Sequence, residues 1–114
     1  MRFINLCPHD VTFELTDGRI VQLEMAGTVA RQAVTTEEYG VIPFDDKSGI
    51  RSYKTEVGDA VNLPKEMPGV MLVVSAIVRL NNPHRKDLVS PSSVYRTLDE
   101  NGNVVFVSGV DTNF

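Results

Sequence analysis

The fold is decided by the stretch Pro68-Gly-Val-Met-Leu-Val-Val-Ser-Ala-Ile-Val-Arg-Leu-Asn-Asn-Pro-His-Arg-Lys-Asp-Leu-Val-Ser-Pro91. Its residues 70–74 are all apolar and do not alternate with polar ones, which is typical of a strand that is covered on both faces. A dense polar segment follows this run, so the stretch predicts a buried strand that positions a charged loop.

Two structures compete for residues 76–82, between the apolar run and the polar loop. Ser75 can cap a helix, and Ala76, Ile77 and Leu80 would then form its inward face. A continuing strand is the rival interpretation. Pro83 stops a helix at this point in the chain, because it lacks an N–H and restricts the residue before it.

Alternation of apolar and polar residues predicts short strands over much of the remaining chain. The predicted strands are 2–6, 11–15, 19–24, 28–36, 39–44, 50–57, 94–98 and 104–110. Asp17-Gly18 and Asn101-Gly102 mark two tight hairpins. Glu37-Glu38 is expected to separate two strands, residues 58–69 to be irregular, and the tail 111–114 to be loose.

These elements predict a mainly β, β-rich α+β fold, with about eight short strands and at most one short helix. Whether the strands close a small barrel or stack as a sandwich stays open. The length of 114 residues suits a single domain over 1–114.

The composition excludes several functional classes. No apolar run approaches the roughly 18 residues of a membrane span, and no signal peptide is present, so we expect a cytoplasmic protein without membrane contact. The single cysteine, Cys7, excludes an internal disulfide and a multi-cysteine zinc site. The net charge of −4 and the lack of a basic block argue against binding of duplex nucleic acid.

The polar segment after the buried strand is the richest candidate for a binding site. Guanidinium groups bind phosphate or carboxylate in bidentate fashion, and amide and hydroxyl groups can read the rest of a ligand. The predicted ligand-binding residues are Arg79, Asn82, His84, Arg85, Asp87 and Ser90, with Arg31 contributed by a second segment. The competing interpretation is a solvated loop in which Arg85 and Asp87 simply pair, a contact worth under about 1 kcal/mol when exposed.

His9 and Asp10 form a secondary candidate. Histidine can act as a base, but adjacent residues on an extended chain point to opposite faces, so Asp10 is better placed to accept backbone amides in a turn. Cys7 is expected to be a small core side chain rather than a nucleophile. The spacing of the histidines matches no metal motif, so we expect neither a metal nor a cofactor.

Three segments together carry a resemblance. They are Asn5-Leu-Cys-Pro-His-Asp-Val11, Gly27-Thr-Val-Ala-Arg31, and Pro68-Gly-Val-x-x-x-Val-Ser-Ala76 with Arg85-x-Asp87 and Ser90-Pro91. The set resembles a family of short, largely uncharacterised open reading frames of bacteria and their phages, which commonly open with Asn-Leu-Thr-Pro-His. Cys7 stands where that family usually has threonine. The resemblance implies a phage or prophage origin and names no activity.

Three functions remain open on this basis. The first is a small binding protein that sequesters an anionic small molecule such as a nucleotide signal, with a site that can lie between the subunits of a homo-oligomer. The second is a virion accessory protein or an inhibitor of a host protein, acting by protein–protein contact through a strand edge. The third is an enzyme using His9 or His84, for which the sequence contains no catalytic motif.

Overall fold

The structure is a computed structural model that describes all residues, 1–114. It consists of ten strands and one helix, so the predicted mainly β fold with at most one short helix is confirmed. The elements are β1 (Arg2–Asn5), β2 (Val11–Glu14), β3 (Ile20–Leu23), β4 (Arg31–Pro43), β5 (Gly49–Val61), β6 (Val70–Val73), α1 (Ala76–Leu80), β7 (Leu88–Pro91), β8 (Arg96–Leu98), β9 (Val104–Val107) and β10 (Val110–Thr112).

Strand β6 lies inside a four-stranded sheet of order β1-β6-β7-β10, where it pairs in parallel with both β1 and β7. Successive side chains of a strand point to opposite faces. Accordingly, Leu72 and Val74 join one buried cluster with Leu88, while Val73 joins another with Val89. The prediction of a strand covered on both faces is therefore confirmed.

A second four-stranded sheet has the order β3-β2-β9-β8. Both predicted tight hairpins are found in it, and Gly18 and Gly102 adopt φ angles of 87° and 81°, which glycine reaches without steric cost. Phe13 and Val107 of this sheet share a buried cluster with Val73 of the first sheet. The two sheets thus pack on each other, and the alternative of a closed barrel is wrong.

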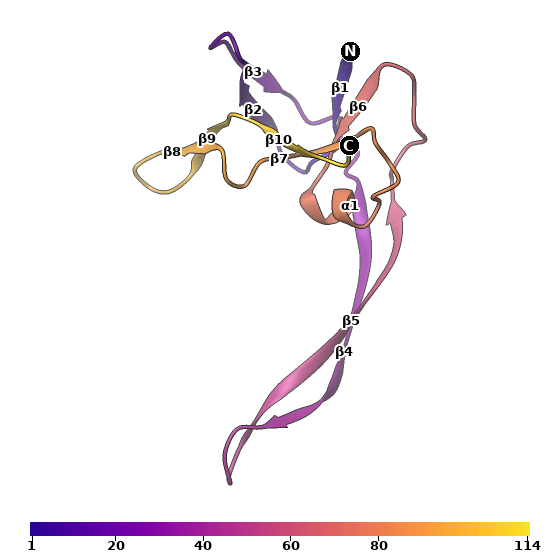
Figure 1. Cartoon of the computed structure of the whole chain (residues 1–114), viewed down its shortest axis with the longest axis vertical. Helices are drawn as coiled ribbons and strands as arrows, with labels where there is room; N and C mark the ends of the chain where they lie inside the picture. The colour runs from indigo at the N-terminus through magenta and orange to yellow at the C-terminus, as the bar shows by residue number, and fades with distance from the viewer.

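The largest departure from the predicted fold is the hairpin β4–β5, which we call the arm. Its two strands have 13 residues each, pair only with each other, and project as a long ribbon below the body of the molecule (Figure 1). The predicted break at Glu37-Glu38 is wrong, because these residues pair in register with Lys54 and Tyr53. The chain therefore extends over 60 × 39 × 26 Å.

The helix and the C-terminus also differ from the prediction in detail. Helix α1 does form, but Val78 is its buried residue, whereas Ile77 and Leu80 are exposed. Ser75 occupies the N-cap position in an extended conformation without a side-chain capping bond. The tail predicted to be loose begins with strand β10, which pairs antiparallel with β7 and orders the end of the chain.

The only helix has five residues, and no helix is long and apolar enough to cross a membrane.

Candidate functional site

Five of the predicted binding residues lie on α1, on the loop that follows it and on β7, and they form a polar network with the C-terminal tail. They are Arg79, Asn82, Arg85, Asp87 and Ser90. Arg79 is the first centre of this network. Its Nε donates to Ser90 Oγ at 2.8 Å, and its Nη1 donates to the Thr112 carbonyl at 3.3 Å and to Asn113 Oδ1 at 3.2 Å. These bonds join α1 to the two neighbouring strands β7 and β10.

Asn113 is the second centre, and no sequence pattern pointed to it. Its Nδ2 lies 3.1 Å from each of the carbonyl oxygens of Arg79, Asn82 and Arg85. An amide group with two N–H donors can serve several carbonyls in this way at the end of a helix, where carbonyls lack intrahelical partners. Lys86 Nζ adds a bond of 2.8 Å to the Asn113 carbonyl. The tail therefore closes over the loop that follows α1.

Arg85 and Asp87 form a bidentate ion pair, with Nε–Oδ1 and Nη2–Oδ2 distances of 2.9 and 2.8 Å. The two side chains are only 15% and 5% exposed, so the pair is largely buried rather than solvated. The hydrogen bonds that the Asp87 carboxylate accepts from the Arg85 guanidinium raise the pKa of Arg85. Arg85 Nη2 also donates to the Pro64 carbonyl at 2.8 Å, which ties the irregular segment before β6 to the loop.

These contacts limit the ability of the predicted site to bind a ligand. Nε and Nη1 of Arg79 and Nε and Nη2 of Arg85 are directed to internal acceptors, and Asn82 Nδ2 is bonded to Gln32 Oε1 and to the Val78 carbonyl. Ser90 and Asp87 are buried. The geometry is that of a structural network that fixes the loop, because most polar groups of the predicted site are engaged in intramolecular hydrogen bonds.

The remaining predicted residues lie outside this network. Arg31 begins β4 and is exposed, and His84 is exposed in the loop without a hydrogen-bond partner. His9 Nδ1 lies 3.0 Å from the Asp10 carbonyl oxygen. Asp10 does accept a backbone amide, from Met25 at 2.8 Å, but that residue is 15 positions away, so the bond links two segments instead of closing a local turn.

Asn5 is the residue that shapes the turn before His9. Its buried side chain accepts from the Cys7 amide at 2.9 Å and donates to the carbonyls of His9 and Leu23 at 3.0 and 2.9 Å. Cys7 is buried beside Val73, and burial raises the pKa of its thiol, which opposes formation of a nucleophilic thiolate. The expectation of a core cysteine is confirmed.

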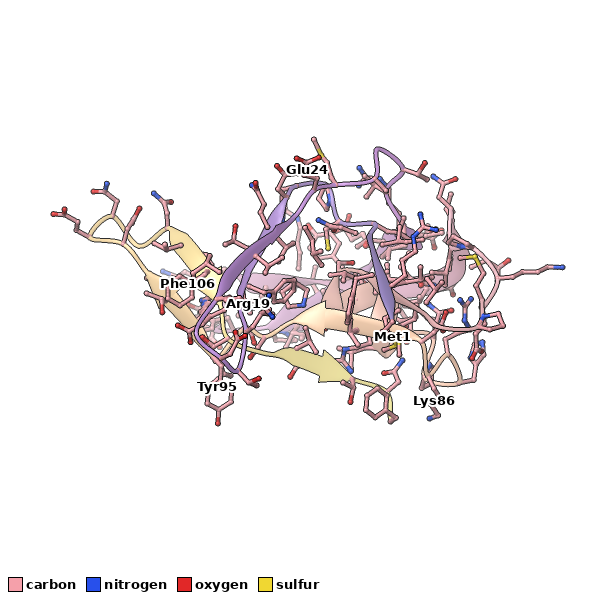
Figure 2. The ribbon with its side chains drawn as sticks, turned by 90° about the horizontal axis from the view of Figure 1, so that it is seen from above. Met1, Arg19, Glu24, Lys86, Tyr95 and Phe106 are labelled. Atoms are coloured by element: carbon pink, nitrogen blue, oxygen red, sulfur yellow. The ribbon has the colours of Figure 1, made fainter.

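A groove of about 440 Å³ lies between the Cys7–Asp10 turn and the β8–β9 hairpin. Its polar lining includes His9, Ser75, Ser93 and Arg96, and it contains hydrophobic walls from β9. Arg96 has no internal hydrogen bond or ion pair through its side chain and is exposed. The hairpin that carries it, with Tyr95 and Phe106, lies across the body from Lys86 of the polar network (Figure 2). The groove is thus a separate concave site with one free guanidinium.

Besides the groove, the arm is a second candidate surface, because its strands pair only with each other. Its tip loop is ordered by Asp45, whose Oδ1 accepts from the amides of Lys47 and Ser48 at 2.9 and 2.8 Å; these bonds lower the pKa of the carboxyl. A Cβ at Gly49 would collide with the Val41 side chain, so the strands meet closely beneath the tip. The large apolar residues exposed on the arm are Val34, Tyr39, Val41, Ile42, Phe44, Ile50, Tyr53, Val57 and Val61.

No protein-family model, no curated protein and no solved structure matches this chain.

Proposed function

We propose that the protein is a small structural or accessory protein of phage or prophage type that acts by protein–protein contact, with the arm as its contact surface. Its working form on this proposal is an assembly of two or more chains. The phage or prophage origin rests on the sequence resemblance, and the mode of action rests on the shape and surface of the arm.

The observation that carries the proposal is the excess of exposed surface. The chain exposes 8137 Å², whereas a compact monomer of 12.6 kDa exposes about 6,200 Å². Its radius of gyration is 18.0 Å, against about 13 Å for a compact chain of this length. The excess of about 1,900 Å² is comparable with the total of about 1,600 Å² that a standard protein–protein interface buries.

The low stability expected of an isolated hairpin also supports a protein–protein contact through the arm. A two-stranded hairpin alone is marginally stable in water, because its faces have nothing to pack against. The arm nevertheless carries apolar side chains such as Tyr53 and Phe44 that are 61% and 72% exposed. Large exposed apolar patches mark interaction sites. A contact that covers the arm would remove these side chains from water.

Trimming the arm provides the test. Residues 36–55 are replaced by Asn-Gly, which closes a two-residue hairpin between the paired residues Thr35 and Glu56. We expect light scattering after size exclusion to give a mass above 12.6 kDa for the natural chain and a mass near that of one chain for the trimmed variant. Circular dichroism serves as the control that the body still folds. A natural chain that stays monomeric at all accessible concentrations would refute the proposal.

The free guanidinium of Arg96 favours a second candidate function, the binding of an anionic small molecule such as a nucleotide in the groove. Arg96 would pair with a phosphate, and His9 and Ser93 line the same hollow. Because charge-assisted bonds contribute about 1.5–3 kcal/mol, Arg96→Ala should weaken binding of AMP or pyrophosphate at least about tenfold in titration calorimetry. Arg31→Ala, which removes an exposed guanidinium elsewhere, is the matched control. Equal affinities for the two variants would exclude the groove.

A further inference from the structure

Strand β5 has a free edge along its whole length, because the arm is a two-stranded sheet. Such an edge presents unpaired N–H and C=O groups that can accept another strand. Proteins protect exposed edges with proline or bulges. Both strands of the arm carry a register irregularity, near Tyr39 in β4 and near Gly58 in β5, and β4 also carries Pro43. The edge of β5 contains no proline.

We propose that two copies of this chain form a two-fold symmetric dimer in which β5 pairs antiparallel with the β5 of the partner, with the axis passing through Thr55. The inference rests on the proposed function, since it names the partner and the edge that the arm uses. Thr55 is the midpoint of β5, which runs from Gly49 to Val61. A two-fold axis at this point lets the whole strand of each copy take part.

The residue pattern of β5 is complementary about this midpoint. An antiparallel pairing centred on Thr55 places Lys54 opposite the partner's Glu56 and Tyr53 opposite the partner's Val57. Opposite charges and aromatic–β-branched pairs both stabilise neighbouring strands. Each contact occurs twice in an interface with two-fold symmetry. Within one chain, Lys54 and Glu56 are held only by an exposed contact of 3.7 Å, which leaves both charges available.

The outer positions continue this pattern. Arg51 falls opposite the partner's Asp59, although an extra residue of β5 near Gly58, opposite Ala33, bends the strand there. The long arginine side chain can span the altered spacing. Ile50 falls opposite the partner's Ala60, so the apolar tip of each arm reaches the base of the other arm. The exposed Ile42 and Phe44 beside Ile50 are then brought towards the partner's body.

Two alternative pairings of the arm strands lack this complementarity. A pairing of β4 with itself about its midpoint would place Glu37 opposite the partner's Glu37, and like charges in that position are destabilising. A parallel, in-register pairing of β5 would place Lys54 opposite the partner's Lys54. The antiparallel pairing through β5 is therefore the arrangement that the charges favour.

Charge reversal at two positions tests the pairing. Lys54→Glu and Glu56→Lys each create two like-charge contacts, so each variant alone should dimerise about tenfold or more weakly than the natural chain in analytical ultracentrifugation. An equimolar mixture of the two variants should recover the dimer, because every contact is again between opposite charges. Lys65→Glu, which makes the same charge change outside the arm, should leave dimerisation unchanged.

A cysteine scan tests the register independently of charge. The variant Thr55→Cys places two thiols on the axis and should form an intermolecular disulfide on mild oxidation, while Ser52→Cys, opposite the partner's Gly58, should not. The buried Cys7 does not compete. If the charge-reversal variants assembled as well as the natural chain, and if both cysteine variants cross-linked equally, the β5 pairing would be overturned. The arm would remain the contact surface in that case. A chain that remains monomeric would overturn the pairing and the proposed function together.

Discussion

Replacing Leu72 by alanine is expected to lower the free energy of unfolding by about 3 kcal/mol. Leu72 is 1% exposed and lies at the centre of β6, in the buried cluster that contains Val78 of α1 and Leu88 of β7. The substitution removes buried apolar volume that the neighbouring strands cannot refill, because β6 is hydrogen-bonded on both sides. Urea denaturation followed by circular dichroism, at one fixed protein concentration, measures the effect.

Leu80→Ala is the matched control, since it makes the same chemical change on the outer face of α1, where the side chain is 62% exposed. We expect this variant to change the free energy of unfolding by less than about 0.5 kcal/mol. Equal losses for the two leucines would contradict the assignment of β6 as the centre of the core. The comparison also tests the orientation of α1, because the sequence pattern placed Leu80 inward.

Asp87→Ala is expected to destabilise the protein by about 3 kcal/mol, because it leaves the guanidinium of Arg85 without its partner in a largely buried position. The loss should appear in the same urea titrations. It should be accompanied by faster amide exchange in residues 62–67, since Arg85 also holds the Pro64 carbonyl.

The double variant Arg85→Met, Asp87→Leu separates the ion pair from the cost of an unpaired charge. Replacing both partners of a buried pair by apolar side chains is often nearly neutral, so this variant should recover most of the stability that Asp87→Ala loses. If Asp87→Ala instead changed the free energy of unfolding by less than about 0.5 kcal/mol, the pair would be a solvated surface contact, as in the competing interpretation of the sequence.

The polar segment shows how far residue types can predict a site. Arg79, Arg85 and Ser90 were predicted as one polar set because they follow a buried strand within a few residues, and Arg79 does bond to Ser90. Their partners could not be predicted: Asn113 and the Thr112 carbonyl come from the far end of the chain. An arginine that is free to bind a ligand and one that bonds within the fold can have the same local sequence. Only the distant hydrogen-bond acceptors distinguish them.

The sequence predicted three short strands in the region of the arm. The strand 28–36 was expected to be separate from the hairpin of 39–44 and 50–57. The pattern located the turn near Asp45 correctly, since alternation stops there and resumes at Ile50. The length of the hairpin was missed because Glu37 and Glu38 resemble a break between strands. In a ribbon exposed on both faces, charged residues are compatible with continuous pairing, so burial patterns no longer mark the strand ends.

Local sequence patterns were enough to predict the mainly β class, the buried strand at 70–74 and the hairpins at Asp17-Gly18 and Asn101-Gly102, but they left residues 76–82 open between helix and strand. Each of these follows from interactions between residues close together in the chain, such as turn geometry and side-chain alternation. Only the folded chain shows the open pair of sheets, the internal hydrogen bonds of Arg79 and Arg85, and the projection of the arm. These depend on contacts between segments far apart in the chain, which local patterns do not specify.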